Sequence, residues 1–265
     1  MSNNNTTYKE TSIGLIPSDW EVKKLGEIAK IKHGKDQKGF EEDNGKFPIL
    51  GSGGVIGRTN NFLYDKPSVL IGRKGTIDKP RFMDTPFWTV DTLFYTEIAN
   101  NIEPLWLFYK FETINWYLYN EASTVPSLNG STISSIKLSI PTYSEQQKIA
   151  NIISTWDKAI EKCKGIIDSL KDRNIGLAQQ LLTGKKRVIG FEKSQWHLKS
   201  LEEVATFKNG KAHENAIDED GDYIVVNSKF ISTEARISKA SNENLCPLYK
   251  DSIVMVMSDI PNGKA

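Results

Sequence analysis

Four basic side chains lie within ten residues, in the stretch GRKGTIDKPR at 72–81: Arg73, Lys74, Lys79 and Arg81. Lysine and arginine on a glycine-containing loop can contact phosphates, and an arginine can also bind guanine through two parallel hydrogen bonds. Runs of charge are more often simply solvated surface. The stretch 72–81 is therefore either a solvated surface loop or a loop that contacts nucleic acid.

Two further polar loops could join this one. GSGGVIGR at 51–58 is either a glycine-rich phosphate loop or a tight hairpin turn, and it lacks the Lys-Ser/Thr pair of a Walker motif. VPSLNGSTI at 125–133 offers a serine and an asparagine as base or phosphate donors. The predicted DNA-binding set is Lys35, Ser52, Arg58, Arg73, Lys74, Lys79, Arg81, Ser127 and Asn129.

Catalytic chemistry finds little support in the sequence. The three histidines fit no HExxH pattern, and no glycine motif or Asn-Pro-Pro-Tyr motif of an amino-methyltransferase occurs. The two cysteines have no metal spacing, and no apolar run approaches the roughly 18 residues that cross a membrane. We therefore predict a non-catalytic protein with no metal and no cofactor. Because no signal peptide is recognisable, we also predict that it is cytoplasmic.

Net charge is +1 for the 265 residues, but it is unevenly distributed. Residues 20–82 hold 13 Lys/Arg and 8 Asp/Glu (+5), whereas residues 83–143 hold 2 and 6 (−4). The basic excess therefore falls on the segment that contains most of the predicted DNA-binding residues.

The elements that must position these loops read as a mixed fold. Short apolar runs predict strands at 46–50, 68–73, 91–98 and 136–141, and amphipathic runs predict helices at 23–31 and 104–120. Because strand and helix do not alternate regularly, we predict an α+β class, with a first recognition domain over 1–143.

Residues 144–184 predict one long helix of coiled-coil type. Ser144 and Gln147 fit a capping box, Gly184 fits a C-terminal stop, and no proline intervenes. Apolar residues repeat with heptad spacing, so a helix about 57 Å long would pack lengthwise on another helix; the alternative is an ordinary core helix. The predicted partner-binding residues are Ile149, Ile152, Trp156, Ile160, Ile167, Leu170, Leu177 and Leu181.

The chain repeats itself at a distance of 176 residues. WEVKKLGEIAKIKHGK at 20–35 and WHLKSLEEVATFKNGK at 196–211 share 8 of 16 residues. This spacing is the size of a domain with a connector, which indicates a duplicated module. Because Ala265 corresponds to about position 89 of the first copy, we expect residues 185–265 to form an incomplete second copy.

Read in order, the motifs resemble the DNA specificity subunit of type I restriction–modification enzymes. The residues that carry the resemblance are IPSDWEVKKLGEIAKIKHGK, FPILGSGGVIG, LIGRKGTI, PFWTVDTLFY, VPSLNGSTISSIKLSIP, EQQKIANIISTWD and LAQQLLTG, followed by the second W-x-x-K-x-L-x-E-V-A.

The resemblance implies two target recognition domains that each read half of a split site on double-stranded DNA. It also implies two long helices that separate these domains and dock methyltransferase subunits, through which restriction subunits join. The subunit itself would carry no chemistry. Self-association through the long helix is a further expectation. Two alternatives remain: an assembly module that binds methyltransferase subunits without reading DNA, and a fused methyltransferase.

Overall fold

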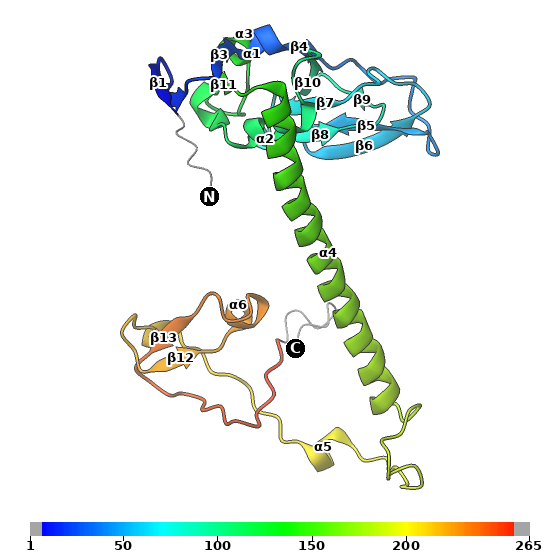
Figure 1. Ribbon diagram of the computed structural model, residues 1–265. Helices are drawn as coiled ribbons and strands as arrows, with labels where there is room; N and C mark the ends of the chain where they lie inside the picture. Colours follow the sequence, from blue (N-terminus) through cyan, green and yellow to red (C-terminus); the bar gives the residue numbers. More distant parts are fainter. Residues whose placement is uncertain (1–6, 257–265) are drawn as a thin grey trace. The chain divides into compact units, whose positions relative to one another are not determined.

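The computed structural model describes residues 7–256, and the chain divides into two units at Lys185/Lys186. Strands and helices are mixed in the first unit, which ends in one long helix (Figure 1), so the predicted α+β class is confirmed. Among the helices between residues 7 and 256, none has the length and apolar character needed to cross a membrane.

The first unit contains these strands and helices: β1 (Tyr8–Thr11), β2 (Gly14–Pro17), β3 (Glu21–Lys24), α1 (Leu25–Ile28), β4 (Ala29–His33), β5 (Phe47–Gly51), β6 (Gly54–Thr59), β7 (Ser68–Gly72), β8 (Arg81–Met83), β9 (Trp88–Thr89), β10 (Leu93–Ile98), α2 (Pro104–Glu112), the 3₁₀ helix η1 (Trp116–Tyr119), α3 (Gly130–Ser135), β11 (Lys137–Ile140) and α4 (Tyr143–Leu182).

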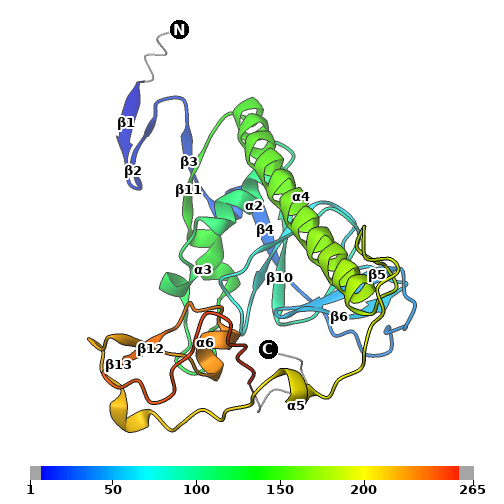
Figure 2. The same ribbon diagram turned by 90° about the horizontal axis from the view of Figure 1, so that it is seen from below.

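A four-stranded sheet in the order β4-β10-β7-β8 forms the centre of this unit, with every neighbouring pair antiparallel. A second sheet has the order β6-β5-β9, in which β5 pairs antiparallel with β6 and parallel with β9. The β3–β11 ribbon and the β5–β6 hairpin lie at opposite sides of the central sheet (Figures 1 and 2).

The four predicted strands are confirmed, but the helix predicted over 23–31 is wrong. Only Leu25–Ile28 is helical, because the residues before it pair with β11 and the residues after it pair with β10. These long-range ladders override a helical sequence pattern. The predicted helix over 104–120 is also shorter, ending at Glu112 before the separate 3₁₀ turn η1.

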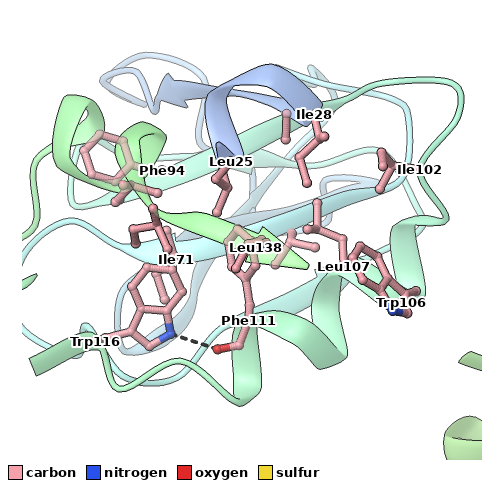
Figure 3. Packing of buried hydrophobic residues seen from close by; sticks show 14 of the residues in the cluster. Leu25, Ile28, Ile71, Phe94, Ile102, Trp106, Leu107, Phe111, Trp116 and Leu138 are labelled. Atoms are coloured by element: carbon pink, nitrogen blue, oxygen red, sulfur yellow. Dashed lines mark hydrogen bonds between the residues drawn. The ribbon is translucent and has the colours of Figure 1, made fainter. Parts of the chain in front are cut away.

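The core of the first unit lies between the central sheet and the helices α1, α2 and α3. Figure 3 shows part of this core, in which aliphatic and aromatic side chains pack together. The ring centres of Phe111 and Trp116 lie 5.2 Å apart. The indole N–H of Trp116 donates to the carbonyl of Phe111 at 3.0 Å, so this buried polar group is satisfied. Leu25 and Ile28 of α1 complete the packing at 0% and 2% exposure.

The helix α4 starts inside this unit rather than beside it. Its N-cap is Thr142, which makes no side-chain cap bond, so the predicted Ser144–Gln147 capping box is wrong. Tertiary contacts take its place: buried Gln146 accepts from the backbone N–H of Glu103 and donates to the carbonyl of Pro141, both at 2.9 Å. At the other end, Gly184 adopts the predicted left-handed stop with φ of 71°.

One more contact holds α4 before it leaves the domain (Figure 1). The Tyr109 hydroxyl on α2 donates to the Asp157 carboxylate at 2.5 Å. Burial, together with that carboxylate, raises the pKa of Tyr109 well above its usual range, so the phenol keeps its proton. At 1.5 Å per residue the 40-residue helix is about 60 Å long, and most of it lies past this contact.

The second unit contains α5 (Leu201–Val204), the 3₁₀ helix η2 (Glu214–Ala216), β12 (Tyr223–Val225), α6 (Ser228–Ser232) and β13 (Lys239–Ser241). β12 and β13 pair antiparallel. The helix α5 has the length of α1 and lies at the same place in the repeat, 176 residues further along.

Candidate nucleic-acid interface

Three loops predicted from sequence lie next to one another on the first unit. The loop between β7 and β8 touches the β5–β6 turn, where the guanidinium of Arg81 donates to the carbonyl of Ser52 at 3.4 Å. It also touches the segment before α3, through a bridge between Lys74 and Ser127 and a bond from the Gly75 N–H to the carbonyl of Pro126 at 2.9 Å. We call these segments, residues 51–54, 73–81 and 126–129, the three-loop face.

The sequence left two alternatives for residues 51–58, a phosphate loop or a tight hairpin turn. The structure shows the hairpin. β5 and β6 pair directly from Phe47↔Thr59 to Gly51↔Gly54, with a two-residue turn. Gly54 has φ of 138°, and a Cβ at this position would lie 3.5 Å from the Arg81 guanidinium. Glycine is required here by the backbone conformation, since that region strains residues with a side chain.

Arg73, on the three-loop face, is held in place through both its backbone and its side chain. Its backbone N–H donates to the carbonyl of Thr92 at 2.8 Å, and its carbonyl accepts from the Leu128 N–H at 2.9 Å. Its Nη1 donates to the backbone carbonyl of Asp91 at 3.1 Å and lies 3.4 Å from the Asp91 carboxylate. Backbone and side chain are therefore both fixed.

The lysine side chains, unlike that of Arg73, are not held by an ion pair within the described residues. Lys35, Lys74 and Lys79 are exposed, and their ammonium groups form no ion pair with any residue between 7 and 256. The backbone of Lys35 is nevertheless anchored, because its N–H donates to Thr89 at 2.8 Å and its carbonyl accepts from the Trp88 indole at 3.0 Å. Unpaired ammonium groups on anchored backbone suit contacts to phosphate.

Two predicted site residues have structural contacts of their own. Arg58 donates through Nε to the carbonyl of Gly45 at 2.6 Å and through Nη2 to that of Lys46 at 2.9 Å, so it tethers the preceding loop. Asn129 is the N-cap of α3, where its Oδ1 accepts from the Ser131 N–H at 3.1 Å. This leaves its amide N–H₂ as the donor that could reach a ligand.

Sequence reasoning missed two residues that shape the face. Asp91 holds the Arg73 side chain, and the Asn120 Oδ1 accepts from the Ser127 N–H at 2.8 Å. No motif marks either residue, since each lies 7 or more positions from its partner in the chain. Within residues 7–256, no group of three or more His, Cys, Asp or Glu side chains is arranged to hold a metal ion.

The predicted partner-binding residues of α4 fall into two groups. Ile149 packs against the core of its own domain, and Leu181 is half-buried. The other six are 41–68% exposed: Ile152, Trp156, Ile160, Ile167, Leu170 and Leu177. We call these six the α4 seam. Such a long apolar stripe in water is unusual for a protein surface.

Comparison with known proteins agrees with this architecture. The structure matches the crystal structure of a type I restriction–modification system S subunit from M. genitalium, with a TM-score of 0.56 at 20% identity, over 84% of this chain and 60% of that one. This match shows a shared fold.

Sequence relatives carry the assignment further. The family model for the type I restriction modification DNA specificity domain matches residues 17–172, and the chain belongs to this family. Two curated relatives from Methanocaldococcus jannaschii are the type I restriction enzyme MjaIX specificity subunit, 30% identical over 60% of this chain and 43% of that protein, and the MjaVIII specificity subunit, 26% identical over 77% and 53%. The chain thus spans about half the length of these curated relatives.

Proposed function

We propose that this chain is a sequence-specific DNA-binding specificity subunit of a type I restriction–modification system, and that its three-loop face contacts duplex DNA. The observation that carries the proposal is the convergence of three separate loops, in which the turn with Ser52 and the segment with Ser127 both contact the basic loop of Arg73, Lys74, Lys79 and Arg81. Family membership over residues 17–172, which include all three loops, favours DNA reading over a module that only assembles partners.

The proposed division of labour follows the domain boundaries. Residues 1–143 would be a target recognition domain, residues 144–184 a spacer helix, and residues 185–265 part of a second recognition domain. The exposed lysines would neutralise phosphates, which positions the protein, while the anchored Arg73 and the polar groups at 127–129 would contact bases. The chain itself would supply no catalysis, and it would act in the cytoplasm.

The proposed role of α4 is to bind a partner helix through its seam. Each large apolar side chain that becomes fully buried contributes roughly 1.5–3 kcal/mol, so covering six of them offsets a large cost of association. The proposed partners are methyltransferase subunits, with restriction subunits joining through them, and a second copy of α4 in a self-associated form.

DNA binding is tested by changing Arg73 and Lys74 to Ala together and measuring affinity for duplex DNA across salt concentrations. Affinity should fall, and the slope of log affinity against log salt should flatten by about one unit for each of the two side chains that neutralises a phosphate, so by about two units if both touch phosphates. The matched control is Lys162→Ala with Lys171→Ala, which removes the same charge from exposed positions of α4. Equal behaviour of the two double variants would remove the three-loop face from the DNA site.

Partner binding is tested with Ile160→Lys and Ile167→Lys together, which should abolish co-purification with a methyltransferase subunit and any self-association. The control adds two lysines on the opposite side of the helix, at Gly165 and Ser169, where a Cβ at Gly165 meets nothing within 4 Å. If the native chain sediments as a monomer and captures no methyltransferase subunit, the seam has no role in assembly.

A further inference from the structure

We infer that Arg73 reads a guanine base rather than a phosphate, and that Asp91 is the residue that positions it. This inference rests on the proposed DNA-binding function and assigns one contact within it. The starting observation is that Arg73 is fixed in three ways by residues distant in the chain.

The backbone of Arg73 is held from both sides. The Thr92 carbonyl accepts from its N–H on one side, and its own carbonyl accepts from Leu128 on the other. The residue therefore cannot shift along the surface without breaking two hydrogen bonds. Fixing the Cα position is the first requirement for base reading, since a specific contact depends on a site held to within about half an ångström.

The side chain is oriented as well. Asp91 binds Nη1 through its backbone carbonyl and its carboxylate, at 3.1 and 3.4 Å. The guanidinium has five N–H groups in a planar fork. Among the described residues no acceptor binds its Nε or Nη2, so one complete edge of the fork, with two parallel donors, remains available. Two parallel donors match the O6 and N7 acceptors of guanine.

The charge of Asp91 decides between guanine and phosphate. Its side chain is 70% exposed, whereas that of Arg73 is 29% exposed, so the carboxylate stands at the same surface that would meet DNA. A phosphate bound to the Arg73 guanidinium would lie close to the Asp91 carboxylate, and the two negative charges would repel each other. A base edge carries no net charge, so the carboxylate repels it less. The neighbouring lysines Lys74 and Lys79 are exposed and have no ion pair within the described residues, and they are better suited to phosphate.

Arg81 shows the contrast within the same loop. Its Nη2 is engaged with the Ser52 carbonyl, and its guanidinium lies over the Gly54 turn. Its contacts join the hairpin to the loop, whereas the contacts of Arg73 involve Nη1 alone and leave the Nε–Nη2 edge without a partner among the described residues. The structure thus singles out one of the two arginines.

The experiment uses the full chain and a pool of randomised duplexes to select a bound sequence. Each guanine of that sequence is then replaced in turn by 7-deazaguanine, which keeps base pairing but lacks the N7 acceptor. We expect one position at which the replacement weakens binding by roughly tenfold, in the range of a bidentate pair. Arg73→Ala should remove the sensitivity at this position.

Asp91→Ala gives a readout that a merely structural role would not produce. It should reduce the discrimination between guanine and 7-deazaguanine, while affinity for non-specific duplex stays equal or rises, because a negative charge has left the surface. Lys74→Ala is the control and should weaken all duplexes alike, with full discrimination retained.

Two results would overturn the inference alone: a selected site in which no guanine is sensitive, or an Arg73→Ala protein that keeps the sensitivity. A chain that binds no duplex at any salt concentration would instead overturn the proposed function, and this inference with it. A uniform loss with Asp91→Ala, for specific and non-specific duplex alike, would show that Asp91 only supports the fold.

Discussion

The two copies of the repeat form the same local structure in different surroundings. α1 and α5 are each four residues long, and in both a glutamate at the third position accepts the N–H of the N-cap residue, Glu27 for Lys24 and Glu203 for Ser200. Yet Leu25 is 0% exposed and its equivalent Leu201 is 66% exposed. The sixteen similar residues thus form the same helical turn in both copies, but they do not by themselves bury it.

What buries the first copy is distant in sequence. β3 pairs with β11, α1 packs on α3, and the core cluster supplies Phe111 and Trp116. Trp20 adds a hydrogen bond from its indole N–H to Glu145 of α4 at 3.0 Å. Its equivalent Trp196 lies instead against the guanidinium of Arg187, 5.3 Å from the ring centre. The same tryptophan therefore has a different partner in each unit.

The largest expected effect is in amide hydrogen exchange. The N–H of Ala29 and the N–H of Ala205 bond to equivalent carbonyls, Leu25 and Leu201. Because α1 lies in a buried core, its opening should require cooperative unfolding, so Ala29 should exchange at least about a thousandfold more slowly than Ala205. Mass spectrometry of peptides over 25–31 and 201–207 measures this. Equal protection would mean that unit 2 buries its copy as well.

A smaller effect is expected from truncating the equivalent leucines. Leu25→Ala should lower the free energy of unfolding of the first unit by about 2–5 kcal/mol, since it leaves a cavity in a packed core. Leu201→Ala should change stability by less than about 0.5 kcal/mol, as for an exposed side chain. Urea unfolding followed by fluorescence compares them. A large loss from Leu201→Ala contradicts the comparison.

The smallest expected effect comes from the glutamate contact at the N-cap, which both copies have and which should therefore respond similarly in both. Glu27→Ala and Glu203→Ala each remove an acceptor from the N-cap N–H, a local contact worth about 1 kcal/mol in either place. We expect roughly fivefold faster exchange of the Lys24 and Ser200 amides in the respective variants. If only one of the two variants responds, the cap is not a purely local feature.

Sequence reasoning located the basic loops but not how their residues are used. The glycine turns and charge clusters at 51–58 and 72–81 were readable from residue types, as was the serine–asparagine segment at 125–133. That Arg58 tethers residues 45–46 and that Asp91 holds Arg73 depends on contacts between distant segments. A pattern in one segment contains no information about the acceptor that another segment will bring to it.

The sequence by itself determined the features that arise from neighbours along the chain. These include the long helix with its stop at Gly184, the turn repeated at Leu25 and Leu201, and the positions of the core strands β5, β7, β10 and β11. Hydrogen bonds within a turn and hydrophobic periodicity act over a few residues, so they can be read directly.

Only the tertiary structure decided that residues 21–24 and 29–33 are strands, since their partners are β11 and β10, and that Gln146 rather than a capping box fixes the start of α4. It likewise decided which copy of the turn is buried and which arginine keeps a free edge. The physical reason is common to these cases. The free energy of each arrangement comes from contacts between segments that are far apart in the chain, and it outweighs the local preference wherever such contacts form.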